Sequence, residues 1–447
     1  MSAEPVNTRP GGAEMRWTEA DITLAGSLLS DELGMSIGAG IADSVRWFRA
    51  AASRGSGARA DAGGPMTDAL RIVRYHPRAA VGDGGMTGAI KRWSEALSLR
   101  GADLIIAYAD GQPSVTAGPV RWERVRHAGL GGLRAPLDLD GVLADADLLV
   151  LHSGWTAHNA RAASIARSHG VPYLLEPRGA YDPHILARHA RRKRLWWTAG
   201  EGRVVEGAFA IHTFFEEERA HLEAVGFRGP IVVAPNGVDV PEQTWTGGGG
   251  YWLFLGRFDP EHKGLDVLVE AVAGLPPTDR PAIRLRGPDW RGGKATISRR
   301  IAELGLEPWL QVGPAAYGRE KQDLLRQADA FVYPSRWDAC PNAVLEAVAH
   351  GIPTLCGPYP LGAALAERGG AISADATPSS LREAIRRLRD PEVALRIGAT
   401  GRRVVESDFQ WSAVAERWLD QVVGLLRTRR AAGVGPRRRR SASTSVT

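Results

Sequence analysis

Short apolar segments alternate with segments of helical periodicity along most of the chain. From residue 68 to 243 the apolar segments are "LRIVRY", "DLIIAYA", "DLLVLHS", "PYLLEP", "AIHTFF" and "PIVVAP". In the first helical segment, apolar side chains recur every three or four residues: Met86, Ile90, Trp93 and Leu97. Near-continuous apolar strands that alternate with helices predict a parallel sheet covered by helices on both faces.

A glycine-rich break separates this series from a second one. After "TGGGG" come the apolar segments "YWLFLG", "AIRLRG", "QVGP", "AFVYPS" and "IPTLC". Two such series predict an α/β protein with two doubly wound, Rossmann-like domains that face a central cleft. We expect the first domain to span 66–243 and the second 244–408.

The first 65 residues have a different character. They hold two amphipathic stretches, "ADITLAGSLL" and "IADSVRWFRAA", followed by the linker-like run "SRGSGARADAGGP". Two interpretations stay open for this N-terminal extension, 1–65. It is either dispensable, with Met66 as the natural start, or a small helical appendage that packs on the body.

Positive charge is concentrated at the C-terminal end. The net charge of the 447 residues is +6, but residues 427–447 hold seven arginines and no acid, so the rest of the chain carries −1. We expect this Arg/Ser/Gly-rich segment to be a disordered tail that could contact anionic lipid head groups. With no zinc finger and no aromatic-basic stripe in the sequence, we expect no nucleic-acid partner.

The two cysteines, Cys340 and Cys356, form neither a disulfide framework nor a metal-ligand pattern. No apolar run approaches the ~20 residues that span a bilayer, and no signal-peptide core follows the N-terminus. The expected location is therefore the cytoplasm.

Two cations follow the first strand of the second domain, in "LGRFDPEHKGLDVLVEA". Arg257 comes directly after the strand, and Lys263 precedes the next helix. In open α/β sheets, ligands bind beyond the carboxyl ends of the strands. A guanidinium, an ammonium and a helix N-terminus around one loop favour a diphosphate site, although a surface pair is the simpler alternative.

Two acids flank a Pro-Asn turn in "YPSRWDACPNAVLEAVAHGIPTL". Asp338 lies in the loop, and Glu346 lies inside the helix that Pro341 begins. As a pair they could accept hydrogen bonds from a sugar hydroxyl and from a ribose. Their alternative roles are a helix cap and a solvent-facing helix residue.

Taken together, these two stretches resemble the signature motifs of retaining glycosyltransferase family 4, which has the GT-B fold. Further similar segments follow in the same order: "GGMTGAIKRWSEALSLRGADLIIAY", "DLLVLHSGW", "VPYLLEPRGAYDP" and "VVAPNGVDVPE". The resemblance covers residues 68–425 and implies transfer of a hexose from a nucleotide-diphosphate sugar to an acceptor hydroxyl, without a metal or other cofactor. We expect 409–426 to be the terminal helix that crosses back to the first domain.

The resemblance also implies catalytic roles. Arg257 and Lys263 would hold the diphosphate and stabilise the charge on the leaving group. Glu346 would bind the ribose, and Asp338, which stands where the family usually has Glu, would contact the donor sugar. His152 matches a histidine near the transferred sugar.

The remaining assignments concern donor and acceptor binding. The donor-binding residues that we expect are Gly84, Gly85, Ala339, Cys340, Asn342, Arg286, Gly287 and Gly313. For the acceptor, Trp155 could stack on a sugar face, and Arg178 stands where many relatives carry His-Gly.

Other functions stay open beside this one. A dinucleotide-dependent oxidoreductase is disfavoured, because "VGDGGMTG" places Thr87 at the third glycine position of the phosphate-binding fingerprint. A nucleotide-sugar epimerase of the same fold and an inactive binding homologue are compatible with the motifs. The acceptor that we expect is a surface polysaccharide or a lipid-linked glycan, reached from the inner face of the membrane, and a small natural product is the alternative.

Overall fold

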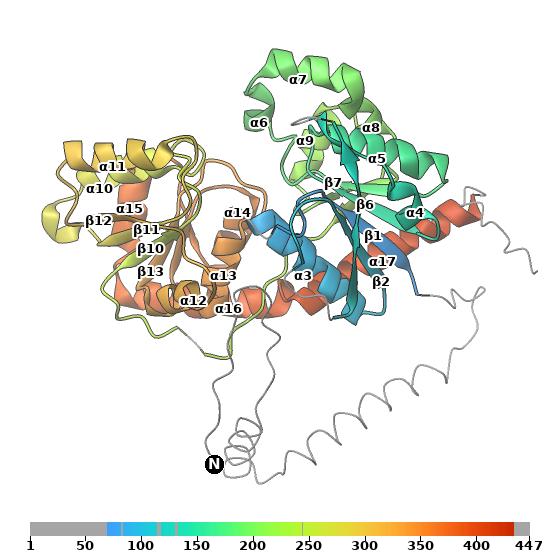
Figure 1. Cartoon of the computed structure of the whole chain (residues 1–447). Helices are drawn as coiled ribbons and strands as arrows, with labels where there is room; N and C mark the ends of the chain where they lie inside the picture. Colours follow the sequence, from blue (N-terminus) through green and yellow to red (C-terminus); the bar gives the residue numbers. More distant parts are fainter. Residues whose placement is uncertain (1–68, 82–83, 114–117, 130–132, 244, 433–447) are drawn as a thin grey trace, which may run out of the picture. The chain divides into compact units, whose positions relative to one another are not determined.

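The computed structural model describes residues 69–432 apart from 82–83, 114–117, 130–132 and 244 (Figure 1). Its contacts divide the chain into two units, Met1–Thr67 and Asp68–Thr447. The two interpretations of the N-terminal extension, 1–65, fall outside the described residues. The following description concerns the second unit.

The first domain contains a seven-stranded parallel sheet in the order β3-β2-β1-β6-β7-β8-β9. Its strands are β1 (Arg71–Tyr75), β2 (Asp103–Tyr108), β3 (Val120–Arg124), β6 (Leu148–His152), β7 (Tyr173–Glu176), β8 (Ala210–Thr213) and β9 (Ile231–Val233). Its helices are α3 (Gly85–Leu99), α4 (Leu139–Leu143), α5 (Ala157–Ser168), α6 (Pro183–Ala187), α7 (Ala190–Trp196), α8 (Gly202–Glu206) and α9 (Glu218–Ala224), with a π-helical turn at Trp197–Glu201. A short antiparallel pair, β4 (His127–Ala128) and β5 (Ala135–Pro136), lies apart from the sheet.

The second domain contains a six-stranded parallel sheet in the order β12-β11-β10-β13-β14-β15. The strands are β10 (Trp252–Leu255), β11 (Ile283–Arg286), β12 (Leu310–Gly313), β13 (Ala330–Tyr333), β14 (Thr354–Cys356) and β15 (Ile372–Ser373). The helices are α10 (Leu265–Ala273), α11 (Gly293–Glu303), α12 (Gly318–Gln327), α13 (Asn342–His350), α14 (Pro360–Glu367), α15 (Pro378–Leu388), α16 (Pro391–Asp408) and α17 (Trp411–Ala431), with a 3₁₀ turn at Pro277–Asp279.

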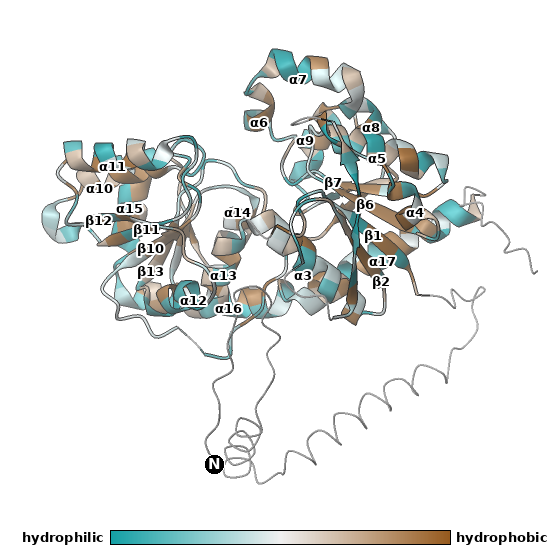
Figure 2. Cartoon of the chain, viewed as in Figure 1, coloured by the Kyte–Doolittle hydropathy of each residue, from teal (hydrophilic) through white to brown (hydrophobic). Residues whose placement is uncertain are grey.

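Both sheets have a doubly wound strand order, which confirms the predicted α/β class. The central strands are buried along their whole length, as in β6 and β10, and Figure 2 shows the hydrophobic residues of both sheets under more polar helices. In each sheet the order reverses once, between β1 and β6 and between β10 and β13. Ligands of doubly wound sheets bind at such switch points.

Helix α3 follows its predicted pattern. Ile90, Trp93 and Leu97 are fully buried, whereas Met86 is half-buried. The helix ends before Gly101, whose φ of 91° is in the left-handed region that suits glycine.

The C-terminal prediction was wrong at its boundary. Helix α17 continues to Ala431, so residues 427–431 are helical rather than part of a disordered tail. Arginine is a good helix former, and two arginines of the last turn find partners in the first domain. Arg430 pairs with Asp147 at 2.9 Å, and the Arg429 guanidinium lies 5.8 Å from the Phe209 ring centroid.

Helix α17 itself packs against α3 and β9. Trp418 of α17 is fully buried, with its ring centroid 6.3 Å from that of Trp93. Sequence reasoning missed the strands β3, β4, β5 and β15. Strand β3 is an edge strand with exposed polar residues, and the other three have only two residues each.

Candidate active site

The predicted site residues lie in the last residues of the strands, on the loops that follow them, or in the helices that those loops enter. The two loops beside the switch point of the second sheet follow β10 and β13, and hydrogen bonds hold them together. His262 O accepts hydrogen bonds from Arg336 N at 3.0 Å and from Ser335 Oγ at 2.9 Å. Gly264 has a φ of 65°, and a Cβ there would lie 2.1 Å from Pro334 O, so glycine is required for this close approach.

These contacts between the loops bring together Lys263 and Asp338, which are 75 positions apart in the sequence. Lys263 Nζ lies 2.5 Å from Asp338 Oδ2, and the two side chains are only 7% and 17% exposed. Tyr333 donates a second hydrogen bond to the same oxygen at 3.2 Å. Sequence reasoning placed both residues at one site, and the structure makes them a buried ion pair.

Electrostatics keeps both partners charged. Burial opposes the charge on Asp338, but attraction to Lys263 outweighs it, and the pKa of the carboxyl falls below its usual value. In the same way burial opposes the charge on Lys263, and Asp338 raises its pKa nevertheless. His262 lies 3.4 Å from Lys263 Nζ, and burial, with the ammonium beside it, lowers its pKa to about 4. The loop thus presents a cation held by a neighbouring acid.

Arg257 lies on the same loop but contacts a different partner. Its guanidinium is 4.5 Å from the ring centroid of Trp290, a residue that is 39% exposed. Cation–π contact of this kind holds the planar guanidinium over an aromatic face while leaving its N–H groups available. The predicted role of Arg257 at a diphosphate stays a prediction.

Glu346 projects from α13 and pairs with Lys321 of α12 at 2.9 Å, with the side chains 28% and 26% exposed. Sequence reasoning missed Lys321, because nothing distinguishes one lysine among the many charges of α12. Arg286, the last residue of the strand β11 beside β10, pairs with Glu320 at 3.2 Å.

Two of the predicted donor-binding glycines, Gly287 and Gly313, also have close neighbours that restrict a side chain. A Cβ on Gly287 would lie 1.7 Å from Gly256 O, and one on Gly313 would lie 2.4 Å from Arg286 Nη1. The backbones of Gly256 and Gly287 therefore approach each other closely whatever the ligand, whereas the close neighbour of Gly313 is a side chain.

Asn342, Gly85 and Asn236 connect the two domains. Asn342 Nδ2 donates to Gly85 O at 3.1 Å, and Asn236 Nδ2 donates to Asn342 Oδ1 at 2.9 Å. Asn236 is 2% exposed and accepts from Trp93 Nε1 at 3.0 Å. Sequence reasoning assigned no role to Asn236, although its position three residues after the end of β9, in "APNG", was a usable signal. Gly84 begins the same contact region, and a Cβ there would meet nothing within 4 Å.

Ala339 and Cys340 complete the loop after β13. Ala339 faces the first domain, because a Cβ on Gly179 would lie 3.2 Å from its Cβ. Cys340 is buried, and burial raises the pKa of its thiol. The loop therefore brings small side chains next to the first domain, as expected where backbone approaches a ligand.

His152 lies in an unforeseen place. Its side chain is fully buried, and its Nδ1 is 3.1 Å from Glu176 Oε2, which also receives a hydrogen bond from Arg74 at 2.9 Å. Burial lowers the pKa of His152 to about 3, so the ring is neutral at pH 7. The structure does not expose His152 to a ligand, and its contact with the transferred sugar stays a prediction.

Glu176 is the centre of this buried cluster. Arg178 Nη2 lies 2.5 Å from Glu176 Oε1, and His212 Nδ1 lies 3.7 Å from Oε2. Burial opposes ionisation of Glu176, but Arg178 and His152 outweigh it and keep its pKa well below the usual value. Sequence reasoning missed Arg74 and Glu176, although charged residues inside the apolar runs "LRIVRY" and "PYLLEP" were a clear signal.

The two predicted acceptor residues sit on strained backbone at the end of the first sheet. Trp155 and Arg178 have φ values of 63° and 53°. Trp155 is held by hydrogen bonds from its backbone N to Glu201 at 2.8 Å and from Nε1 to Ala180 O at 2.9 Å. Its ring also packs on Tyr181 and Trp197.

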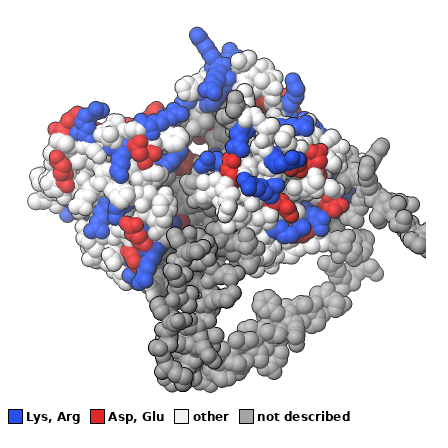
Figure 3. All heavy atoms as spheres, in the orientation of Figure 1, with Lys and Arg blue, Asp and Glu red and all other residues white. Residues whose placement is uncertain are grey.

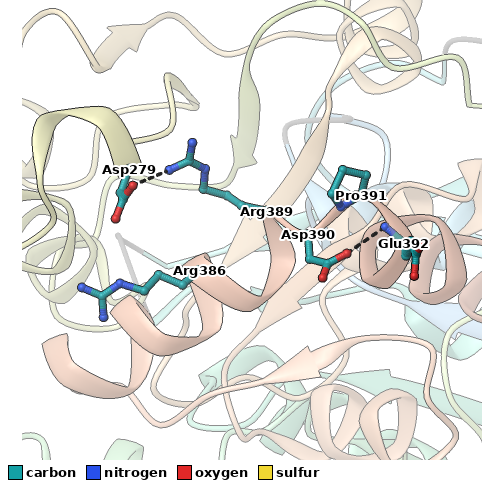
Figure 4. A pocket seen from close by; sticks show the side chains of 6 residues that line it. All are labelled: Asp279, Arg386, Arg389, Asp390, Pro391 and Glu392. Atoms are coloured by element: carbon teal, nitrogen blue, oxygen red, sulfur yellow. Dashed lines mark hydrogen bonds and ion pairs between the residues drawn. The ribbon is translucent and has the colours of Figure 1, made fainter.

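A surface hollow of about 900 Å³ lies elsewhere, lined by Asp279, Arg386, Arg389, Asp390, Pro391 and Glu392 (Figure 4). Arg389 pairs with Asp279 at 3.4 Å, and Asp390 caps α16 through Glu392 N at 2.9 Å. Several of its polar groups are thus occupied by interactions within the protein, and none of the predicted site residues lines it. Within the described ranges, no group of three or more His, Cys, Asp or Glu residues could hold a metal ion.

Comparison with known families supports the resemblance that the motifs indicated. Residues 84–237 match the model described as "Glycosyl transferase 4-like domain", and residues 239–404 match "Glycosyl transferases group 1". The chain belongs to the family-4-like glycosyltransferases. In the described part of this glycosyltransferase, no helix has both the length and the apolar character to cross a membrane.

Individual relatives agree with this assignment. The chain is 28% identical to the D-inositol 3-phosphate glycosyltransferase of Kineococcus radiotolerans, over 79% of this chain and 94% of the relative. It is 24% identical to the GDP-mannose:cellobiosyl-diphosphopolyprenol alpha-mannosyltransferase of Xanthomonas campestris, over 65% and 77% of the two chains.

Solved structures share the fold. The sucrose-phosphate synthase of Thermosynechococcus elongatus superposes with a TM-score of 0.66 at 19% identity, covering 81% of this chain and all of that one. Anabaena HepE, solved in complex with UDP-glucose, has a TM-score of 0.64 at 16% identity, covering 79% of this chain and all of that one. These matches confirm the predicted GT-B fold.

Proposed function

We propose that this glycosyltransferase moves a hexose from a nucleotide-diphosphate sugar to an acceptor hydroxyl, with retention at the anomeric carbon. The observation that carries the proposal is the buried Lys263–Asp338 pair at the switch point of the second sheet. A buried cation there, with Arg257 on the same loop, is the charge that a diphosphate requires. Glu346 on the adjacent helix α13 would receive the ribose hydroxyls.

The same residues would lower the barrier. Negative charge grows on the leaving diphosphate as the bond to the sugar breaks, and cations already fixed in place stabilise it more in the transition state than in the ground state. The leaving phosphate would take the proton of the incoming hydroxyl on the same face of the sugar. The two cations would supply the charge stabilisation without a metal ion.

Asp338 would act on both the donor and the lysine. Its Oδ2 holds Lys263, and among the described residues its Oδ1 accepts a single hydrogen bond, from its neighbour Ala339 N at 3.2 Å. Oδ1 therefore has capacity for a donor-sugar hydroxyl. Asp338 would thereby connect recognition of the sugar to the position of the cation.

For the acceptor we propose a glycan carried on a lipid, in the assembly of a surface polysaccharide. Support comes from the name of the Xanthomonas relative, which specifies a diphosphopolyprenol acceptor. The Kineococcus relative is named for an inositol phosphate, so a small phosphorylated acceptor is the second candidate. Both names describe acceptors that carry phosphate.

We further propose peripheral contact with an anionic membrane at the cytoplasmic face. Residues 183–200 hold five Arg or Lys residues and no acid. Figure 3 shows basic side chains standing out where Figure 1 places α7. Three exposed arginines of α7 have no hydrogen-bond or ion-pair partner among the described residues (Arg191, Arg192 and Arg194), and Leu195 beside them is 71% exposed. Cations with an exposed apolar residue beside them favour binding to a lipid surface, and the Arg-rich tail would strengthen this binding.

Vesicle flotation tests the membrane contact. The full chain should bind vesicles that contain phosphatidylglycerol and not vesicles of phosphatidylcholine alone. Replacing the three α7 arginines with Gln should weaken binding at least about tenfold, because each cation near the surface contributes about 1 kcal/mol. The matched control replaces Arg386, Arg396 and Arg403, also exposed, and should bind like wild type. Equal binding by both variants would contradict a role for α7.

The reaction can be tested before the acceptor is known. Many transferases release the sugar to water slowly, and NMR can identify the anomer that forms first from each nucleotide sugar. A first product with the anomeric configuration of the donor, formed by wild type and not by Lys263→Ala, would support the proposal. The opposite anomer would contradict retention, and equal hydrolysis by wild type and Lys263→Ala would contradict the role of Lys263.

A further inference from the structure

Trp337 is a buried aromatic residue at the meeting point of the two domains. It is 7% exposed and immediately precedes Asp338. Two imidazoles stack on its indole ring, each with centroids 4.9 Å apart: His184 at an interplanar angle of 4° and His262 at 8°. His184 comes from α6 of the first domain and His262 from the loop after β10 of the second, so three separate segments meet in this Trp337 stack.

The stack adjoins the donor site along the chain. His262 immediately precedes Lys263, and Trp337 immediately precedes Asp338. His262 and Trp337 stack on each other, so the residue that precedes each member of the Lys263–Asp338 pair is held in place. Ser335 Oγ lies within hydrogen-bond distance of both His262 O and Trp337 O, at 2.9 and 2.8 Å, and its single proton can be donated to either.

A second contact joins the same segments. Arg188, which follows α6, lies with its guanidinium 5.3 Å from the Trp337 ring centroid and pairs with Glu261 at 2.7 Å. Asp182 orients the stacking imidazole, since its Oδ1 lies 3.1 Å from His184 Nδ1 and caps α6 through His184 N at 2.8 Å. The segment 182–188 of the first domain is thus fixed on the loop that carries the site cation.

We propose that His184, through the Trp337 stack, is a positioning residue for the donor: it orders the Lys263–Asp338 pair from the first domain without touching the ligand. This inference rests on the proposed donor site and adds a first-domain residue that determines how well that site is formed. Without the stack, the loops after β10 and β13 would have to be ordered during binding, and donor affinity would fall by the cost of that ordering.

Calorimetric titration of the full chain tests the inference, with whichever of UDP, GDP, ADP and dTDP raises the melting temperature of wild type. The key variants are His184→Ala, which removes one stacking ring, and His184→Phe, which keeps an aromatic ring. The matched control is His189→Asn, because His189 directly follows the segment 182–188 and its side chain makes no hydrogen bond, ion pair or ring contact in the described part of the chain. Asparagine tolerates the left-handed backbone of residue 189, whose φ is 55°.

We expect His184→Ala to raise the dissociation constant about two- to tenfold, which is the range for loss of one aromatic pair. His184→Phe and His189→Asn should stay within about twofold of wild type on the same scale. Unchanged affinity in His184→Ala would overturn the inference, as would equal loss in the Ala and Phe variants, since neither result depends on stacking. A lower melting temperature with unchanged affinity would show a structural role only. Failure of wild type to bind any nucleoside diphosphate would instead contradict the donor site, and the inference with it.

Discussion

Lys263 carries the positive charge of this site, and its side chain is almost fully buried. A buried ammonium is costly unless an acid compensates it, and Asp338 does so at 2.5 Å. The pair is therefore required for the stability of the fold, apart from its proposed role in the reaction. Its stability effects and its binding effects can be separated, because stability depends on charge balance and binding depends on the cation itself.

Replacing Lys263 with Met should destabilise the fold by about 3 kcal/mol, since an unpaired buried carboxylate is left behind. The double variant Lys263→Met/Asp338→Asn should recover most of this loss, because both charges are gone. Urea unfolding monitored by fluorescence measures both free energies of unfolding. Neither variant should bind a nucleoside diphosphate, and a double variant as unstable as the single one would contradict the account of the pair.

Asp338 stands where the resemblance leads us to expect Glu, and its length is testable. Asp338→Ala should lose most of the donor turnover, because the sugar contact and the partner of Lys263 disappear together. Asp338→Glu should retain nucleotide affinity and alter the preference among donor sugars, since one methylene moves the carboxylate. Turnover with several nucleotide sugars measures this, and wild-type rates in both variants would contradict any role for the position.

At the scale of elements, sequence reasoning found the strands that are apolar and the helix α3, because these signals are local. It also placed Lys263 and Asp338 at one site, since the carboxyl ends of parallel strands share an edge. It could not find the Trp337 stack, the contact between Asn342 and Gly85, or the pairing of Glu346 with Lys321. Each of these depends on how two distant segments approach each other, which no local pattern encodes.

The turn that enters α9 provides a pH prediction. Glu218 is buried and accepts hydrogen bonds from Phe214 N at 2.8 Å and Phe215 N at 3.2 Å. Burial raises its pKa to about 7, so the folded state keeps a proton that the unfolded state loses above its ordinary pKa of 4.5. The stability that Glu218 contributes is therefore present below pH 4.5 and lost as the pH rises to about 7.

Glu218→Gln stays neutral and should gain about 2–3 kcal/mol over wild type between pH 5 and pH 8. Denaturant unfolding at several pH values measures the difference. The exposed Glu223 of the same helix provides the control, and Glu223→Gln should follow wild type at every pH. A constant difference between Glu218→Gln and wild type would mean that Glu218 does not titrate in this range.

At the scale of the molecule, two doubly wound domains and the helix α17 belong to one unit, Asp68–Thr447. A chain that begins at Met66 should therefore fold, bind nucleotide like the full chain and melt within a few degrees of it. Calorimetry of the two chains measures this. A shortened chain that fails to fold would support the alternative interpretation of residues 1–65, in which they pack on the body.

The central claim is that this glycosyltransferase binds a nucleoside diphosphate through Lys263. Its most direct test is thermal shift with UDP, GDP, ADP, dTDP and NAD, each with and without EDTA, on wild type, Lys263→Ala and the control Lys91→Ala, which removes a lysine from a partly exposed ion pair. A ligand at about 100 times its dissociation constant stabilises the folded state by about 2.7 kcal/mol, which is readily measured. The account predicts stabilisation by one nucleoside diphosphate, unchanged by EDTA, kept by Lys91→Ala and lost by Lys263→Ala. Stabilisation by NAD alone, or equal stabilisation of wild type and Lys263→Ala, would contradict it.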